Sequence, residues 1–152
     1  PTRRSSDLAA AVGANNIFPD SNVLIIDLGT AITFDFVNRE NQFVGGNISP
    51  GMAMRFKALH YFTHKLPHLK KKETSLLIGE STESAIIAGV QNGIAFEIDA
   101  YINIFKQKFG KFNVILTGGD AFFFDKKLKN TIFAEPNLVS IGLNEIVNFN
   151  FK

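Results

Sequence analysis

The sequence contains no cysteine, and this absence excludes two classes of site. Disulfides and thiolate metal centres both need cysteine, and a chain without it is compatible with a reducing compartment. The sequence also lacks any apolar run near the roughly 20 residues that span a membrane, and its start lacks the apolar segment of an export signal. We therefore expect a globular, cytoplasmic protein with no membrane partner.

An excess of charge of one sign is also missing. The chain carries 16 basic and 14 acidic side chains, which gives a formal net charge of +2. A balance so close to neutral offers no argument for nucleic acid as a partner, and we do not expect one. A chain of 152 residues fits one domain, which buries roughly two thirds of the surface that its unfolded form exposes.

The first half of the chain predicts strands followed by a helix. Three runs rich in apolar, β-branched or aromatic residues predict three strands, at residues 22–27, 30–37 and 42–48. The polar residues between the second and third runs predict a hairpin. After Pro50 and Gly51, apolar residues recur at helical spacing, and Pro67 is expected to end this helix.

The second half alternates predicted helices and strands. Ser81 and Thr82 are candidate N-caps of a long helix that reaches about Gly110, because isoleucine or valine recurs every fourth residue from Ile86 to Ile102. The sequence then predicts a buried strand, a short helix, a short strand and a closing helix, which begin at residues 113, 121, 131 and 137. This order predicts an α/β fold, with a mixed sheet flanked by helices.

The segment "DLGT", residues 27 to 30, is the first candidate site. Gly29 has no side chain, so backbone N–H groups and the Thr30 hydroxyl can approach a phosphate closely. Asp27, at the end of a predicted strand, can bind a hard cation that accompanies the phosphate. The alternative is ordinary turn chemistry, in which aspartate and glycine only shape a hairpin.

A second glycine pair strengthens the phosphate hypothesis. Gly118 and Gly119 lie where a predicted buried strand leads into a helix, so their amides are placed to contact an anion or a nucleotide. The alternative is that these glycines only permit tight packing between strand and helix. The motif "GGNISPG", residues 45 to 51, adds a third glycine-rich turn.

Together these motifs resemble a known family. The stretches "DLGTAITFD", "GGNISPG", "ALHYFTHKLP", "GESTESAIIAGVQNG" and "TGGDA" are similar to the C-terminal half of a type III pantothenate kinase, and the similarity covers nearly all of residues 8–150. It implies the acetate and sugar kinase/Hsp70/actin superfamily fold, built from two ribonuclease-H-like domains, and a homodimer. It also implies transfer of the γ-phosphate of ATP to pantothenate in coenzyme A biosynthesis, with magnesium and a monovalent cation, potassium or ammonium.

The resemblance gives individual residues a role. It implies that Asp27 binds the monovalent cation and that Thr30, in the turn with Gly29, contacts ATP phosphate. Thr82 resembles the threonine that binds pantothenate, although it is equally suited to be a helix N-cap. Gly118 and Gly119 are expected on the nucleotide side.

The sequence departs from the family at its start. The family has a "DxGNT" phosphate loop near its N-terminus, which does not occur here, and its general base is the aspartate of a "GxDR" motif before a helix similar to Leu8–Val12. Alignment on that helix puts Ser6 at the base position. Residues 1–7 resemble translated sequencing-adapter sequence, so we expect a fragment that does not turn over by itself. Residues 1–20 would be the end of the N-terminal domain, and residues 21–152 the C-terminal domain.

The long helix bears on the implied homodimer. Ile87, Phe96 and Phe105 widen its apolar stripe beyond what one short sheet obviously covers, and Tyr101 lies beside it. We expect part of this helix to face a second subunit. The alternative is ordinary packing against the sheet and the closing helix.

Two further features point to other functions. His60, His64 and His68 are four residues apart, and the first pair would suit a metal ion on one continuous helix, but no carboxylate or cysteine completes the set. The basic run at residues 65–73 is either a solvated loop or a contact for nucleic acid. It supports the alternative function, a non-catalytic accessory module in transcription.

Overall fold

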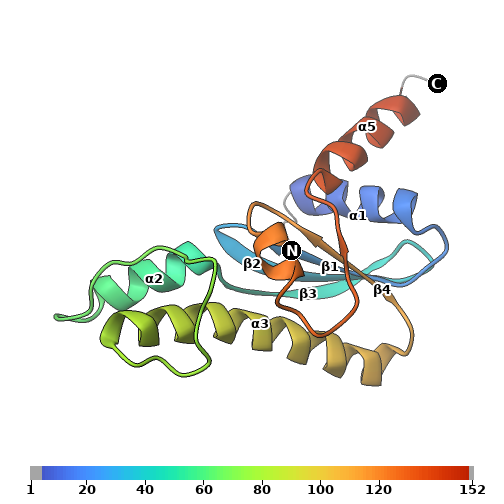
Figure 1. The fold of residues 1–152 in the computed structure, drawn as a ribbon. Helices are drawn as coiled ribbons and strands as arrows, with labels where there is room; N and C mark the ends of the chain where they lie inside the picture. The colour runs from blue at the N-terminus through green and yellow to red at the C-terminus, as the bar shows by residue number, and fades with distance from the viewer. Residues whose placement is uncertain (1–4, 151–152) are drawn as a thin grey trace.

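A five-stranded mixed sheet with helices on both faces forms the body of the molecule in the computed structural model, which describes residues 5–150 (Figure 1). The elements follow in the order α1 (Ser5–Ile17), β1 (Val23–Leu28), β2 (Ala31–Val37), β3 (Phe43–Pro50), α2 (Met52–Tyr61), α3 (Thr82–Phe109), β4 (Asn113–Thr117), α4 (Ala121–Asp125), β5 (Phe133–Ala134) and α5 (Leu138–Asn150). The α/β class and the mixed sheet are therefore confirmed.

The strands lie in the order β3-β2-β1-β4-β5. The first three form an antiparallel meander, which confirms the predicted hairpin, and β4 and β5 add in parallel on the other side of β1. Strand β1 is central, and its burial on both faces explains its continuous apolar sequence.

One face of the sheet packs against α3. Alternate strand residues point to this side and are almost completely buried, among them Leu24, Ile26, Phe34 and Leu116. They meet the stripe of isoleucine and valine on α3, which is also buried. Full burial of each such side chain contributes about 1.5–3 kcal/mol, so this layer carries much of the stability.

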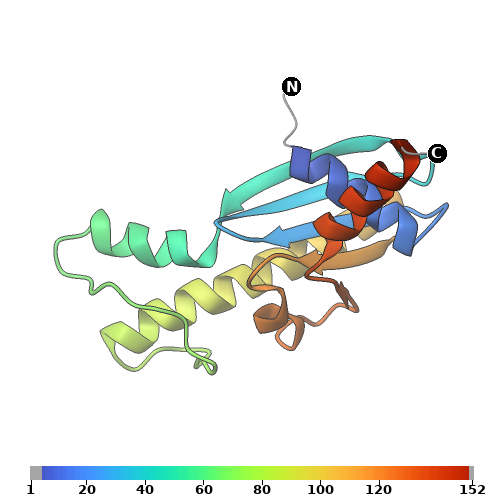
Figure 2. The same ribbon diagram turned by 90° about the horizontal axis from the view of Figure 1, so that it is seen from above.

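The other face is covered by α1 and α5, which Figure 2 shows crossing above the sheet. Small residues let the two helix backbones touch: a Cβ built on Gly142 would lie 1.7 Å from the carbonyl oxygen of Ala9, and one on Gly13 would lie 2.4 Å from that of Leu138. Ala10 and Ala14 continue the small surface against the strands. The crossing therefore needs glycine at both positions.

Helix α2 is shorter than the sequence predicted. It ends at Tyr61, six residues before the proline that was expected to stop it. The Thr63 hydroxyl donates to the carbonyl oxygen of Leu59 and accepts from the amide of Leu66. These side-chain hydrogen bonds take the place of the backbone bonds that a further helical turn would make. The prediction that Pro67 ends this helix is therefore wrong.

The apolar stripe of α3 is used by the core of the chain itself. The residues at every fourth position, and also Ile87, are buried in the core that α3 forms with the sheet and α2, while Tyr101 and Phe105 pack partly buried against it. Phe96 is 54% exposed and Ile104 is 57% exposed. Core packing thus accounts for most of the stripe, while Phe96 and Ile104 stay exposed, and the expectation that part of this helix faces a second subunit stays a prediction.

The start of the chain differs from the expectation as well. Helix α1 begins at Ser5, so Ser6 lies inside the helix that was predicted to begin at Leu8. Residues 1–4, part of the segment with adapter-like sequence, lie outside the described range. None of the described helices is long and apolar enough to cross a membrane.

The helix crossing can be tested with a pair of glycine variants. We expect Gly142→Ala to lower the free energy of unfolding by about 1–3 kcal/mol, because its methyl group would overlap the backbone of Ala9. Gly93→Ala is the matched control, since its Cβ would meet nothing within 4 Å, and it should raise stability by about 0.5–1 kcal/mol through helix propensity. Urea unfolding followed by circular dichroism measures both, and equal effects would contradict the close crossing.

Candidate functional site

Asp27 lies at the end of the central strand. It alternates with Val23 and Ile25, so it is on the face that carries α1 and α5, but beyond their apolar contacts. Its register partners are Thr33 on β2 and Thr117 on β4. The carboxylate is therefore flanked by a threonine on each neighbouring strand.

Two glycine turns enclose this carboxylate. A Cβ built on Gly118 would lie 2.4 Å from Asp27 Oδ1, and one built on Gly29 would lie 3.6 Å from it. Gly118 also has φ +89°, a backbone conformation that residues with a side chain rarely adopt. The amide of Asp120 donates to the carbonyl oxygen of Leu28 at 3.1 Å. The structure thus brings Asp27, Gly29 and Gly118 together, although the two glycines are 89 positions apart in the sequence (118 − 29).

The motif that ends β3 completes the group. The amide of Gly51 donates to the carbonyl oxygen of Thr30 at 3.0 Å. A Cβ on Gly51 would lie 2.2 Å from the carbonyl oxygen of Gly29, so only glycine fits there. Helix α2 starts directly after this contact, and its first amides lie next to the Thr30 turn.

Asp35 is a neighbour of this site that sequence reasoning missed. It lies on the same face of β2 as Thr33, whose hydroxyl donates to Asp35 Oδ2 at 2.9 Å. A Cβ on Gly46 would lie 2.4 Å from Asp35 Oδ1. The spacing Thr33-x-Asp35 within a predicted strand was the available signal, because residues two apart share a face.

A cavity of about 340 Å³ adjoins the glycine turns. It lies between the first residues of α2, the segment 68–71 and Asp120, and it is lined by Met52, Ala53, Phe56, His68, Leu69, Lys70, Lys71 and Asp120. Lys71 Nζ lies 2.7 Å from Asp120 Oδ1, which ties the segment to the turn after Gly119.

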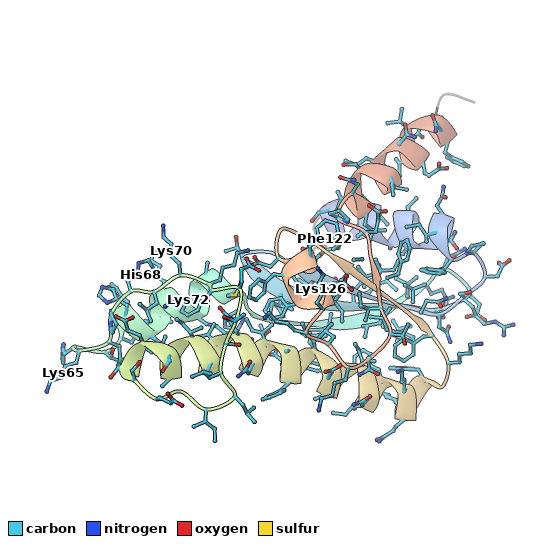
Figure 3. All side chains as sticks on the ribbon, in the orientation of Figure 1. Lys65, His68, Lys70, Lys72, Phe122 and Lys126 are labelled. Atoms are coloured by element: carbon cyan, nitrogen blue, oxygen red, sulfur yellow. The ribbon has the colours of Figure 1, made fainter. Side chains whose placement is uncertain are left out.

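The predicted basic loop is held against the protein at further points. The side chain of Gln91, which is fully buried in α3, accepts from the amide of Lys72 and donates to its carbonyl oxygen. Lys127 Nζ donates to the carbonyl oxygen of Glu73. Figure 3 shows Lys70 pointing outward while the loop crosses above α2 and α3. The backbone of the loop is therefore docked, while its lysine side chains are exposed.

Thr82 lines a different and larger cavity, of about 780 Å³, between α2 and α3. Most of its lining is apolar, and Arg55 is its charged member. Ser81 is the N-cap of α3: its side chain accepts from the amide of Ser84, whose hydroxyl in turn accepts from the amide of Ser81. Because Ser81 performs this role, the alternative that Thr82 is the cap is wrong.

Thr82 does not join the group around Asp27 within one chain. Figures 1 and 2 both show the start of α3 beside α2, beyond the sheet and away from α4.

Ser6 is in the first turn of α1, where its hydroxyl donates to Asp7 Oδ1 at 3.2 Å.

The histidines do not share one continuous helix. His64 lies beyond the end of α2, and His60 Nδ1 is 2.8 Å from the carbonyl oxygen of Leu66. The rings of His60 and His68 are 5.7 Å apart. Within residues 5–150, no group of three or more histidine, aspartate or glutamate side chains is placed to hold a metal ion.

The sequence matches the family model described as type III pantothenate kinase over residues 6–104. The chain belongs to the type III pantothenate kinase family. It is 50% identical over 143 residues to the type III pantothenate kinase of Cytophaga hutchinsonii, covering 94% of this chain and 61% of the relative. The family member of Phocaeicola vulgatus is 50% identical over 145 residues, covering 95% and 60%. The chain thus spans about 60% of the length of these relatives.

Solved structures agree on the fold of this pantothenate kinase family member. A protein described as a conserved Baf family transcriptional activator from Campylobacter jejuni superposes with a TM-score of 0.66 at 24% identity, covering 93% of this chain and 64% of that one. The activator of 2-hydroxyisocaproyl-CoA dehydratase from Clostridium difficile superposes with a TM-score of 0.52 at 14% identity, covering 95% and 68%. These superpositions show that the chain shares the fold of both proteins.

The glycine turn after β4 yields a second paired test. Gly118→Ala should destabilise the protein by about 1–3 kcal/mol, because the backbone has positive φ and the methyl group would strike the Asp27 carboxylate. Gly119→Ala should change stability by less than about 0.5 kcal/mol, since its Cβ would meet nothing within 4 Å. Thermal unfolding of both variants is the measurement. A neutral Gly118→Ala would show that the turn does not enclose Asp27.

Proposed function

We propose that this chain is part of a type III pantothenate kinase that transfers the γ-phosphoryl group of ATP to pantothenate, the first step of coenzyme A biosynthesis. The observation that carries the proposal is the convergence of the turns at Gly29 and Gly118 on the Asp27 carboxylate, in a member of this family. Phosphoryl transfer depends mainly on positioning and on neutralising charge, and these turns supply both kinds of group.

ATP is assigned to the glycine turns. The Thr30 hydroxyl and the amides of Gly118 and Gly119 would contact phosphate oxygens, and the cavity of about 340 Å³ beside Asp120 would take the nucleoside. Magnesium would arrive with the nucleotide. Support comes from position, because this cavity starts at Met52 and Asp120, the residues that follow two of the glycine turns.

Asp27 is assigned to the monovalent cation, potassium or ammonium. The chemistry of the residue fits a cation: the carboxylate supplies hard oxygen ligands, and glycine at position 118 leaves the space that this carboxylate occupies. A bound cation would supply positive charge next to the ATP phosphates. The role of Asp27 is to hold that charge in place.

Pantothenate is assigned to the cavity of about 780 Å³ between α2 and α3. Its apolar lining suits the hydrocarbon part of the substrate, Thr82 offers a hydroxyl, and the guanidinium of Arg55 offers a partner for a carboxylate. Arg55 is already oriented, because it donates to the carbonyl oxygen of Pro50 at 2.8 Å and pairs with Glu97.

A second copy of the chain is assigned to complete the site as a homodimer. Thr82 and Asp27 must act on the same reaction, yet they lie apart within one chain, so we propose that the partner contributes Thr82. The surface around this cavity also exposes large apolar side chains, which is typical of an interface: Met54, Tyr61, Phe62, Leu77 and Ile78.

The phosphate loop and the general base are assigned to upstream residues. Ser6, at the aligned base position, has a hydroxyl that is a poor proton acceptor near neutral pH. We propose that residues 1–20 end an N-terminal domain and that the remaining length of the relatives precedes Leu8. The alternative role as an accessory module in transcription rests on no described contact, because the likeness to the Campylobacter jejuni protein extends to the fold alone.

The assay for this proposal is pantothenate-dependent release of ADP, with ATP, magnesium and potassium supplied. The chain restored upstream of Leu8 from its genomic sequence should turn over, while the 152-residue chain should be slower by at least about 10²-fold, because it lacks the base. A restored protein that neither binds pantothenate nor releases ADP would contradict the function. Robust turnover by the short chain would contradict the assignment of Ser6.

The dimer can be tested by complementation in the restored protein. Asp27→Asn and Thr82→Val should each reduce activity strongly when expressed alone. When the two variants are co-expressed, half of the dimers combine them, and one of their two sites is intact if Thr82 acts across the interface. Activity should then recover to about a quarter of the wild-type value. No recovery, or a monomer in sedimentation at micromolar concentration, would contradict the shared site.

A further inference from the structure

We infer that Thr33 and Asp35 extend the cation site at Asp27: Thr33 supplies a second oxygen, and Asp35 is a positioning residue that orients the Thr33 hydroxyl. The inference rests on the proposed role of Asp27. It goes beyond that role because neither Thr33 nor Asp35 stands out as a site residue in the sequence.

The three side chains share one face of the sheet at neighbouring positions. Thr33 is the register partner of Asp27 across the antiparallel β1–β2 ladder. Side chains at such paired positions have Cβ atoms about 4.5–5.5 Å apart, close enough for both to contact one small ion. Asp35 follows two residues after Thr33 and therefore projects from the same face.

The hydroxyl of Thr33 has one proton, and it uses this proton in a hydrogen bond to Asp35. Thr33 Oγ1 donates to Asp35 Oδ2 at 2.9 Å, and an ionised carboxylate can only accept. The Thr33 oxygen therefore has only lone pairs to offer to a cation held at its register partner Asp27. A carboxylate facing the lone pairs of a hydroxyl is an arrangement that attracts a cation, whereas a hydroxyl donating to Asp27 would compete with one.

The orientation is built into the fold. Thr33 is 9% exposed, so its side chain has little freedom to turn away. Opposite Asp35, β3 has Gly46, where a Cβ would lie 2.4 Å from Asp35 Oδ1 and 2.5 Å from the carbonyl oxygen of Phe34. Glycine at this position leaves the space that the Asp35 carboxylate occupies. This gives Gly46 of the "GGNISPG" motif a physical role.

The experiment measures potassium binding directly and does not depend on turnover. Thallium(I), a potassium substitute, is titrated into the 152-residue chain and followed by thallium-205 NMR. Melting temperatures in potassium chloride and tetramethylammonium chloride at equal ionic strength give a second readout, because a ligand of the folded state raises stability. Circular dichroism checks that each variant is folded.

The variants separate positioning from charge. Thr33→Val should weaken the cation about tenfold, as expected for the loss of one polar contact to a charge, while Thr33→Ser, which keeps the hydroxyl, should stay within about twofold of wild type. Asp35→Ala should match Thr33→Val. The cation affinity of the double variant should lie within about twofold of that of Thr33→Val, because Asp35 acts through Thr33. Glu40→Ala, which removes an exposed charge in the β2–β3 turn, should change nothing.

The outcomes distinguish this inference from the proposed function. If Asp27→Asn abolishes binding while Thr33→Val retains it, the cation role of Asp27 stands and the inference is wrong. If Thr33→Val and Asp35→Ala weaken binding additively, Asp35 acts as a separate charge and the positioning role is wrong. If the wild-type chain shows no preference for potassium over tetramethylammonium, both the inference and the role of Asp27 fall.

Discussion

The close approach of three backbone turns around the end of β1 is the constraint on which the candidate site depends. Gly51 lies against the carbonyl oxygens of Gly29 and Thr30, and Gly118 lies against Leu28 and the Asp27 carboxylate. A side chain at Gly51 or Gly118 would push the turns apart by more than its neighbours can yield. Asp27, Gly29 and Gly118 are therefore close together because the chain has glycine where its backbones meet.

The two faces of the sheet are packed by side chains of different size, and this difference determines how deeply Asp27 is buried. Large aliphatic and aromatic side chains fill the layer under α3, whereas small residues bring α1 and α5 close to the other face. The smaller layer covers Val23, Ile25 and Ile115 but leaves Asp27 half-buried at its edge. The carboxylate therefore lies where the apolar layer under α1 and α5 ends.

Polar contacts anchor several segments that pack against α3 and α4. In α3, the Asp99 carboxylate, only 8% exposed, accepts from the amides of Lys129 and Asn130, which holds the chain after α4. Gln91, also on α3, holds Lys72, and Lys71 pairs with Asp120. The ammonium groups of Lys71 and Lys127 both lie over the ring of Phe123, 5.3 Å and 4.6 Å from its centroid. Helix α3 thus holds both the loop at Lys72 and the chain after α4.

The sequence by itself determined the α/β class, the order of strands and helices, and the family. The first two follow from local periodicity, and the family follows from motifs whose residues are contiguous in the sequence. It did not determine where α2 ends. The Thr63 hydroxyl binds the carbonyl oxygen of Leu59 at the end of this helix, and the sequence around Thr63 contains no clear helix-stop motif. It also did not determine which apolar residues of α3 are buried and which, like Phe96, are exposed, because burial depends on the elements that pack against the helix. The contact between the "DLGT" and "TGGD" turns and the role of Asp35 were decided only by tertiary structure. Strand register brings those residues together, and register is a property of pairing between distant segments.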